Sequence, residues 1–421
     1  MRVVVGLSAC LALARSAWAQ PPVVDSLRLT RREAIAEALT RNPQIDVARE
    51  QSAQSRARRV QAIAIPDPAV VGSIAQNSAT LNPGLAASRA VGVALDVPFP
   101  TKFALRNRVA TADVRASESN IRLQQQTIAS STSATYDSLL VARRLRAILL
   151  ESRQLSVNFL TRTQARYTAG TVARLDVIRA QVDVAQSDNA LIANERDVAN
   201  AQASLNRLLG RVIGLPIAPA DSLGVPPALP DSTTIERIAL TSRPEVAVLE
   251  SQQRGAQANT TLLKQFWAPD LTFGISHDFT LPDAPLVSAG VALPLPILFR
   301  QHTRGEIAES QYRERELAAS ARDLRAQVTQ DVRSAFANAN TALRQVVFLR
   351  DQLVPSAREA FRVASVSYGL GGLSALDVLD ARRSLQDAET QLAVALGAAN
   401  TARADLQRAL GVPLTSLPAA P

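Results

Sequence analysis

The stretch that decides the fold occurs twice in this chain, as YTAGTVARLDVIRAQ at Tyr167–Gln181 and as YGLGGLSALDVLDAR at Tyr368–Arg382. In both copies a tyrosine precedes a glycine by three residues and a Leu-Asp-Val run follows, and the offset between the copies is 201 residues (368 minus 167). Two further blocks repeat at the same offset, Leu39–Ile45 with Leu240–Val246 and Leu205–Gly210 with Leu406–Gly411. Similarity at one fixed offset in three separate blocks indicates an internal duplication.

The duplication divides the chain into two parts of similar length. We predict one repeat over residues 30–212 and a second over residues 232–413. The segment between them, residues 213–231, is rich in proline and is predicted to be a linker, while residues 414–421 form a short C-terminal tail. Each repeat is expected to run in the order helix, two strands, a very long helix, a turn and a second long helix.

The N-terminus, MRVVVGLSACLALARSAWAQ, has the organisation of a secretory signal. A basic start precedes an apolar run, and the A-W-A sequence at 17–19 fits a small-residue cleavage site, so residues 1–19 are predicted to be a signal peptide. A lipoprotein signal is the alternative, because the L-S-A-C sequence ending at Cys10 resembles a lipobox. Cys10 is the only cysteine, so cleavage leaves a chain with no disulfide and no thiolate ligand.

No stretch after the signal is apolar over the roughly 18 residues that a transmembrane helix needs. We therefore expect the mature chain in the periplasm, in the exterior, or in an outer membrane that it crosses with strands. The composition also argues against nucleic acid as a partner. The formal charge of +9 comes from arginines that are interleaved with Asp and Glu along helical stretches, whereas a nucleic-acid binder gathers its basic residues into a patch with aromatics.

The chain offers few residues for catalysis or metal binding. Its histidines are His277 and His302, and the sequence has no Cys/His cluster and no glycine-rich phosphate loop. His277 is expected at the surface of a strand. We therefore predict no enzymatic activity, no cofactor and no metal site.

Four segments alternate apolar residues with small or polar ones at a period of two: residues 67–77, 89–98, 270–280 and 286–296. A length of about ten residues with one apolar face suits a tilted strand in an outer-membrane barrel. Any one of these segments alone would equally fit an ordinary half-buried hairpin. Four strands cannot close a barrel and a bilayer tolerates no open sheet edge, so the strands are expected to pair with those of other copies.

The remaining sequence is typical of very long packed helices. No Gly or Pro interrupts residues 101–169, and the equivalent stretch 306–368 contains only Pro355. A helix over residues 102–167 would be on the order of 100 Å long at 1.5 Å per residue. A shorter helix is expected near the start of each repeat, with a break at Arg41-Asn42 in the first. Gly170, and Gly371 with Gly372, are expected to supply the positive φ angles that reverse the chain between the long helices.

With these features the sequence resembles the TolC family of outer-membrane efflux ducts. The motifs are Y-x-x-G-x-x-x-x-L-D-V-L-D-A at Tyr368–Ala381, FLRDQLVPSAREAFRVASVSYG directly before it, and the junctions LDVPFPTKFALRNR (95–108) and LPLPILFRQHTRGE (293–306). The resemblance covers both repeats. It implies a mainly α protein with a small transmembrane β part, which forms a homotrimer with a 12-stranded barrel in outer-membrane lipid and a periplasmic α-helical tunnel. It also implies two partners, a periplasmic adaptor protein and an inner-membrane pump of the resistance-nodulation-division type.

The resemblance further implies roles for the twin turns, which would lie at the periplasmic tip of the tunnel. The adaptor contact would be Gly170, Thr171 and Val172 together with Gly371, Gly372 and Leu373. Tyr368 and Asp176 match positions of a lock that closes the tip, and Leu373 takes the place of the family's lock arginine.

Two acidic residues, Asp377 and Asp380, match the ring that lines the aperture in the family. They are three residues apart and share one helix face, so a trimer would present six carboxylates that favour cations. Asp377 has a second interpretation, because Ser374 and Asp377 also fit a helix N-cap with an acidic residue at N3.

Other functions remain open at this point. The same fold could serve as a duct for type I protein secretion, and a coiled-coil structural protein of the periplasm that forms no channel is a different class of answer. The sequence does not distinguish a drug, a metal ion or a protein as the exported substrate.

Overall fold

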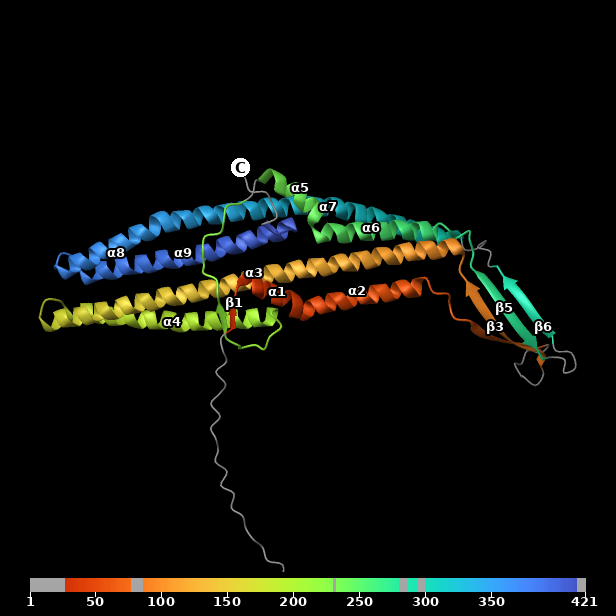
Figure 1. Ribbon diagram of the computed structural model, residues 1–421, viewed down its shortest axis with the longest axis horizontal. Helices are drawn as coiled ribbons and strands as arrows, with labels where there is room; N and C mark the ends of the chain where they lie inside the picture. The colour runs from red at the N-terminus through yellow and green to blue at the C-terminus, as the bar shows by residue number, and fades with distance from the viewer. Residues whose placement is uncertain (1–26, 77–85, 230–231, 280–285, 294–299, 415–421) are drawn as a thin grey trace, which may run out of the picture.

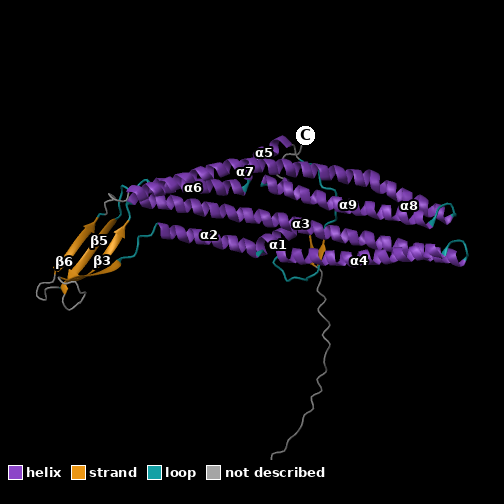
Figure 2. Cartoon of the chain, turned by 180° about the vertical axis from the view of Figure 1, so that it is seen from behind, coloured by secondary structure: helices purple, strands orange, loops and turns teal. Residues whose placement is uncertain are grey.

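The computed structural model describes residues 27–76, 86–229, 232–279, 286–293 and 300–414. The predicted signal peptide and nearly all of the predicted C-terminal tail lie outside these residues. The molecule is elongated, with long helices side by side along its length and a small sheet at one end (Figure 1, Figure 2). The two turns that join the long helices lie together at the opposite end.

β1 (Leu27–Leu29) precedes the first repeat, which contains α1 (Arg31–Arg41), α2 (Pro43–Ala62), β2 (Ala69–Gln76), β3 (Ala86–Val97), α3 (Pro100–Thr168) and α4 (Arg174–Leu208). After β4 (Ile217–Pro219), the second repeat contains α5 (Ser232–Ser242), α6 (Pro244–Leu263), β5 (Leu271–Asp278), β6 (Leu286–Ala292), α7 (Arg300–Phe348), the π-helical turn η2 (Leu349–Leu353), α8 (Val354–Gly369) and α9 (Ala375–Leu410).

The break between α1 and α2 falls where the sequence predicts it. Asn42 leaves the helical conformation, and its side chain accepts a hydrogen bond from the Gln44 amide at 2.9 Å as the N-cap of α2. Pro43 occupies the first position of α2, where its missing N–H is of no consequence. The Asn42 side chain also donates to the Leu208 carbonyl at 2.8 Å, so the break is tied to the end of α4.

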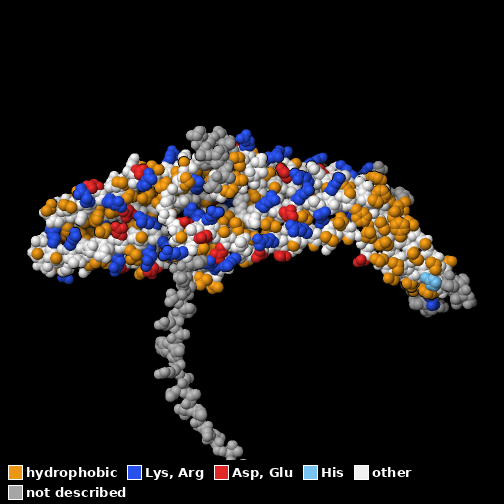
Figure 3. All heavy atoms as spheres, viewed as in Figure 1, with side chains coloured by type: hydrophobic (Ala, Val, Ile, Leu, Met, Phe, Trp, Pro, Cys, Tyr) orange, Lys and Arg blue, Asp and Glu red, His pale blue; other side chains and the backbone are white. Residues whose placement is uncertain are grey.

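The four-stranded sheet is antiparallel throughout, in the order β2–β3–β5–β6. The β3–β5 pairing joins the two repeats. On one face of the sheet, Val93 pairs with Ile275, and Ile275 pairs with Ala289. The neighbouring residues of the three strands, Ala94, Gly274 and Gly290, pair in the same way on the opposite face. Hydrophobic side chains cover the sheet end of the molecule (Figure 3). The sheet therefore has one apolar face and one face of small residues, with β2 and β6 at its edges.

The helices are arranged around α3, which runs the full length of the helical part. In the half nearer the sheet, α3 packs against α2 and α6, and α6 packs against α7. In the half nearer the turns, α3 packs against α4 and α9, and α9 packs against α8. The helix order is therefore α2–α3–α6–α7 near the sheet and α4–α3–α9–α8 near the turns (Figure 1). None of the described helices is both long and apolar enough to cross a membrane.

Two features of the fold depart from the sequence-based expectation. The predicted linker is not wholly irregular, because Ile217–Pro219 pairs in parallel with Leu27–Leu29. Buried Tyr136 of α3 donates its hydroxyl to the Leu29 carbonyl at 2.8 Å and fixes this small sheet to the helices. The second very long helix is also not continuous, since η2 interrupts it directly before Pro355.

The interruption has a physical cause. Proline has no N–H to donate to the carbonyl four residues earlier, and its ring clashes with that carbonyl in a regular α-helix. The wider π-helical turn at Leu349–Leu353 places Pro355 near the start of α8. At that position the missing N–H leaves no carbonyl of α8 without a partner, and the ring does not clash with the preceding turn.

Candidate functional site

The twin turns have the same backbone structure. Thr171 donates its amide to the Arg166 carbonyl at 3.0 Å, and Gly372 donates to the Ser367 carbonyl at 2.9 Å. Each bond spans five residues, as in the helix-ending motif that a left-handed glycine completes. These pairs are again 201 residues apart, so the duplicated sequence produces a duplicated turn.

Within each turn one glycine carries the reversal. Gly170 has a φ of 71° and Gly371 a φ of 83°, as expected. The expectation for Gly372 is wrong, because Gly372 is not among the positive-φ glycines of the structure and its equivalent in the first turn is Thr171. Since one left-handed residue is enough to end a helix in this motif, the second glycine is not needed for the backbone path.

The tyrosines that open the two turns lie in different surroundings. Tyr167 is exposed, whereas Tyr368 is buried with its ring centroid 5.4 Å from that of Phe159. The Arg166 guanidinium lies 4.6 Å from the centre of the Tyr368 ring and donates to the Tyr368 carbonyl at 2.5 Å. The Tyr368 hydroxyl is 3.4 Å from the Thr163 hydroxyl. Tyr368 therefore connects the second hairpin to α3 of the first.

The predicted lock residues are not all brought together within one chain. Asp176 lies 3.6 Å from Arg179 on its own helix, and the described residues include no hydrogen bond between Asp176 and Tyr368. Leu373 is exposed in the second turn and provides an apolar side chain there. Within the single chain, the polar partner of the Tyr368 hydroxyl is Thr163.

The predicted aperture residues, Asp377 and Asp380, lie on the first turns of α9. Ser374 and Asp377 form a capping box: the Ser374 amide donates to Asp377 at 2.9 Å, and the Asp377 amide donates to the Ser374 hydroxyl at 3.3 Å. Hydrogen bonds from the Ser374 hydroxyl and amide lower the pKa of Asp377 below its usual value. Asp380 is exposed, and no ion pair within the described chain involves it.

A buried ion pair behind the turns was not predicted from the sequence. Arg382 of α9 pairs with Asp183 of α4, and their side chains are 5% and 1% exposed. Arg382 also donates to the Ser152 hydroxyl of α3 at 2.5 Å, and that hydroxyl donates to Gln386 at 2.6 Å. The network joins three helices from both hairpins. The sequence does hold one sign of this buried arginine. Arg382 lies four residues after Val378 and three before Leu385, on the apolar face of the helix, where an exposed arginine is not expected.

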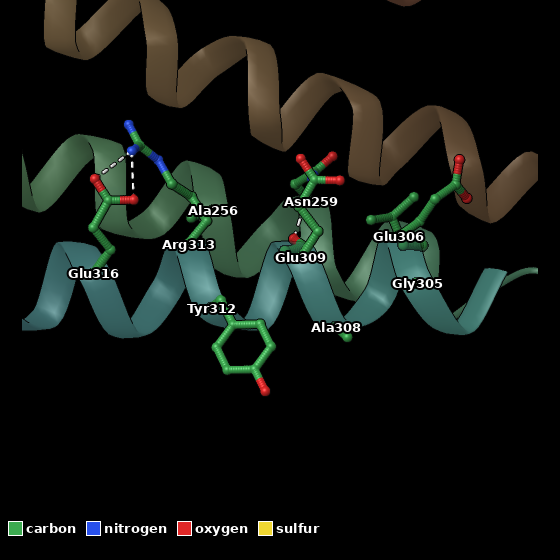
Figure 4. Close-up of a pocket in the computed structure, with 11 residues that line it drawn as sticks. Ala256, Asn259, Gly305, Glu306, Ala308, Glu309, Tyr312, Arg313 and Glu316 are labelled. Atoms are coloured by element: carbon green, nitrogen blue, oxygen red, sulfur yellow. Dashed lines mark hydrogen bonds and ion pairs between the residues drawn. The ribbon is translucent and has the colours of Figure 1, made fainter. Parts of the chain in front are cut away.

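A wide groove of about 1130 Å³ lies at the other end of the helical layer, between α6 and α7. Figure 4 shows Asn259 of α6 beside Glu309 of α7, and Arg313 paired with Glu316, with an Arg313–Glu316 distance of 2.6 Å. Among the described residues, no group of three or more His, Cys, Asp or Glu side chains could hold a metal ion. The groove therefore presents charged side chains without a metal-binding set, and the twin turns remain the candidate functional site.

Comparison with known proteins identifies the family of this architecture. The family model described as "Outer membrane efflux protein" matches residues 34–211 and again residues 237–412. The cobalt-zinc-cadmium resistance protein CzcC of Cupriavidus metallidurans is 24% identical over 312 residues, covering 72% of this chain and 73% of CzcC. The pyoverdine export outer membrane protein OpmQ of Pseudomonas putida is 27% identical over 285 residues, which cover 65% of this chain and 60% of OpmQ.

Solved structures share the fold. The outer-membrane channel OprN superposes with a TM-score of 0.78 at 18% identity, covering 91% of this chain and 90% of OprN. CusC superposes with a TM-score of 0.77 at 20% identity, covering 94% of this chain and 96% of CusC. The open MtrE outer membrane channel of Neisseria gonorrhoeae has a TM-score of 0.73 at 19% identity, with coverages of 91% and 89%.

Proposed function

This chain belongs to the outer membrane efflux protein family, and from that premise we propose that three copies of it form one duct. The family consists of outer-membrane channels and not of enzymes, with helices that form a tunnel in the periplasm. The chain is therefore an outer-membrane efflux channel. The trimer is the proposed step beyond this, with a barrel of 12 strands, four from each copy.

The proposed trimer rests on the two unpaired edges of the four-stranded sheet. β2 and β6 each pair on one side only within the described chain, and exposed edges in lipid leave backbone groups without hydrogen bonds. Pairing β6 of one copy with β2 of the next satisfies both edges and closes a ring. Membrane fractionation with gel migration of unheated and heated samples tests this. We expect a heat-dissociated trimer in the outer-membrane fraction, and recovery as a periplasmic monomer would contradict the proposal.

Members of this family work in tripartite pumps with a periplasmic adaptor and an inner-membrane pump. We propose that the pump of this system is of the resistance-nodulation-division type. The two relatives are named for different cargo, CzcC for cobalt-zinc-cadmium resistance and OpmQ for pyoverdine export. Both nevertheless match this chain at a similar sequence identity, so the sequence of the duct does not follow the cargo. We infer that the pump and not the duct selects the cargo. Exchanging the pump and adaptor while keeping this duct should therefore change the exported compounds.

The adaptor contact is proposed at the twin turns, at Gly170–Val172 and Gly371–Leu373. The space around Gly371 is open, with no atom within 4 Å of an added Cβ, so a side chain there costs backbone strain at positive φ and not a clash. Gly371→Glu should abolish export while trimers still form. Gly290→Ala, a substitution in the sheet that also meets open space, is the matched control. Normal export by Gly371→Glu would place the adaptor elsewhere.

The aperture is proposed at Asp377 and Asp380. Six carboxylates from three copies would focus negative potential at one constriction and attract cations. Purified trimers in planar bilayers should be cation-selective and blocked by multivalent cations from the periplasmic side, and Asp377→Ala combined with Asp380→Ala should lose both properties. Because Asp377 also caps α9, Asp380→Ala alone is the cleaner variant. Unchanged selectivity and block in both variants would leave Asp377 as a helix cap only.

A further inference from the structure

A pocket of about 400 Å³ lies between α3, α4 and α9, where the two hairpins pack side by side (Figure 1). Gly397 of α9 approaches Val141 of α3 so closely that a Cβ atom at Gly397 would clash with the valine side chain. Most of the wall is made of small or apolar side chains: Val141, Ala142 and Leu145 of α3, Ala201 of α4, and Val394 and Ala398 of α9. The pocket therefore offers an apolar space that both hairpins line.

The pocket lies on the face of α3 that is opposite to the linker. Tyr136 of α3 donates a hydrogen bond to the Leu29 carbonyl of β1, which pairs with β4. Val141 and Leu145 lie about 140° and about 180° further around the helix, because successive residues of an α-helix are about 100° apart. The small sheet of β1 and β4 therefore does not cover the pocket.

Two lining side chains are buried, and each has an oxygen atom that lacks a hydrogen-bond donor. Asp137 is 1% exposed, and Arg31 binds its Oδ1, but its Oδ2 has no partner among the described residues. Asn194 is 4% exposed and donates its Nδ2 to the Ala142 carbonyl at 3.1 Å, but its Oδ1 has no partner within the same part of the chain. Buried acceptors without a donor are uncommon, because nothing replaces their lost hydration. A donor from outside the chain therefore fits this place.

The charge of the wall indicates the kind of donor. Asp137 and Asp197 line the pocket, whereas neither a lysine nor an arginine of the described residues does. Asp197 is exposed and pairs with its sequence neighbour Arg196 at 2.9 Å, an ion pair of little expected strength in water. Carboxylates repel an anionic ligand and attract a cationic N–H donor, with which they form strong hydrogen bonds. An apolar wall with a few polar atoms is typical of small-molecule sites of this volume.

We propose that this pocket binds a small amphipathic amine. Its ammonium group donates to Oδ2 of Asp137, its apolar part packs against Val141, Leu145 and Val394, and a second N–H group of the ligand fits Oδ1 of Asn194. The ligand contacts α3 and α4 of the first hairpin and α9 of the second, so it binds where the two hairpins meet. One chain provides the whole site, and binding therefore does not depend on the trimer.

Equilibrium dialysis of tryptamine against the purified protein in detergent tests this site. Tryptamine combines an ammonium group, an indole N–H and an apolar ring system, and tryptophol is its neutral counterpart with a hydroxyl in place of the ammonium group. We expect saturable binding of tryptamine, and binding of tryptophol that is weaker by about tenfold, because a charge-assisted hydrogen bond is lost. Protein-free micelles give the background for both compounds.

Asp137→Asn tests the role of the carboxylate. With Arg31 still bound to Oδ1, the new amide group takes the place of Oδ2 and presents donors where the ligand also has donors. The affinity for tryptamine should fall by about tenfold or more, whereas tryptophol should change little because a hydroxyl can also accept a hydrogen bond. Asp46→Asn, a change at an exposed carboxylate of α2, is the matched control and should keep both affinities.

Ala398→Trp tests the position of the site independently. Ala398 is exposed on α9 and lines the pocket, so a large side chain there should fill the space and abolish binding of both compounds. Ala398→Ser keeps the space open and is the control. If Ala398→Trp does not fold, the comparison of Asp137→Asn with Asp46→Asn decides alone.

Three results would overturn the proposed site. Without saturable binding of tryptamine, the two free oxygens are left to water. Equal affinities of the wild type for tryptamine and tryptophol would show that the carboxylate does not select an amine. Binding that persists in folded Ala398→Trp would place the amine elsewhere on the protein.

Discussion

The two long hairpins descend from one duplicated sequence, yet the helix that leads from the sheet to the tip differs between them. In the first hairpin α3 runs without interruption from Pro100 to Thr168. In the second, the same path is divided into α7, the π-helical turn η2 and α8. The tips nevertheless have the same turn and the same backbone hydrogen bonds.

The interruption coincides with a change in the offset between the repeats. In the cores nearer the sheet, Ile128, Thr132 and Tyr136 correspond to Val328, Val332 and Phe336, an offset of 200 residues (328 minus 128). At the tips, Tyr167 corresponds to Tyr368, an offset of 201 residues. The second hairpin therefore has one extra residue, and a π-helical turn is the local structure that holds an extra residue within a helix. The π-helical turn of the second hairpin therefore accommodates an inserted residue while the tip keeps its position.

The largest expected effect comes from deleting a residue from the hairpin that has no π-helical turn. Deleting Glu151, an exposed residue of α3, rotates everything after it by about 100°, because a regular helix has no extra residue to give up. Phe159 then leaves its core with Ala180 and Val378. We expect a loss of more than about 5 kcal/mol in the free energy of unfolding, because several buried contacts at about 2–5 kcal/mol each are lost. Urea unfolding of the purified protein measures this.

Deletion of Asp351 from η2 is the control, because the π-helical turn can become a regular helix and leave the tip in place. Asp351 is half exposed and pairs with its neighbour Arg350 at 2.6 Å, an ion pair of little expected value, so the expected cost is that of Pro355 in a regular helix, about 3 kcal/mol. If the two deletions unfolded at the same urea concentration, the extra residue of the second hairpin would not be what the π-helical turn absorbs.

Much of this comparison could be predicted from the sequence, since it depends on local pattern. The absence of Gly and Pro predicts α3, the alternation predicts the strands, and Pro43 marks the break after α1. Pro355 indicated a disturbance, but proline alone does not distinguish a kink from a π-helical turn. The β1–β4 pairing was missed because each strand has three residues, too few for a period to be recognised.

The side-chain network of the site was hidden for a different reason. Arg382 and Asp183 are 199 residues apart, and only the packing of α9 on the first hairpin brings them together. Tyr368 and Thr163 meet in the same way across 205 residues. Periodicity assigns each side chain to a helix face but does not say which helix lies opposite, so the partners could not be predicted.

The second prediction concerns this tie between the hairpins. Arg382→Ala leaves Asp183 buried without its partner and should cost about 3–5 kcal/mol. Arg383→Ala is the matched control, because Arg383 is half exposed and 3.9 Å from Asp183. Replacing both Arg382 and Asp183 by leucine should cost less than Arg382→Ala alone. If Arg382→Ala and Arg383→Ala unfold alike in urea, the pair does not hold the hairpins together.

The third prediction compares the helix starts after the two turns. α9 begins with the Ser374–Asp377 capping box, whereas α4 begins at Ala173 with no side-chain cap. Ser374→Ala should cost about 1 kcal/mol, and Ala173→Ser should stabilise the first hairpin by a similar or smaller amount. Hydrogen exchange of the first amides of each helix measures both effects locally. Faster exchange in α9 together with slower exchange in α4 is expected, and no change in either helix would exclude capping as a difference between the repeats.

The smallest expected effect concerns a buried acid that the second repeat lacks. Asp137 pairs with Arg31, but its burial outweighs that pairing and raises the pKa to about 6, whereas the corresponding residue of the second repeat is Ala337. Because an unfolded aspartate has a pKa of about 3.9, only the folded protein gains a proton as the pH falls through about 6, so this group stabilises the fold increasingly toward acid pH. The wild type should therefore gain roughly 0.8 kcal/mol over Asp137→Asn between about pH 7 and about pH 5.5. Urea unfolding of both proteins at the two pH values measures the gain, and Asp46→Asn, a change at an exposed carboxylate of α2, is the control. Parallel pH profiles of the wild type and Asp137→Asn would show that Asp137 is already ionised in the folded protein and that Arg31 outweighs its burial.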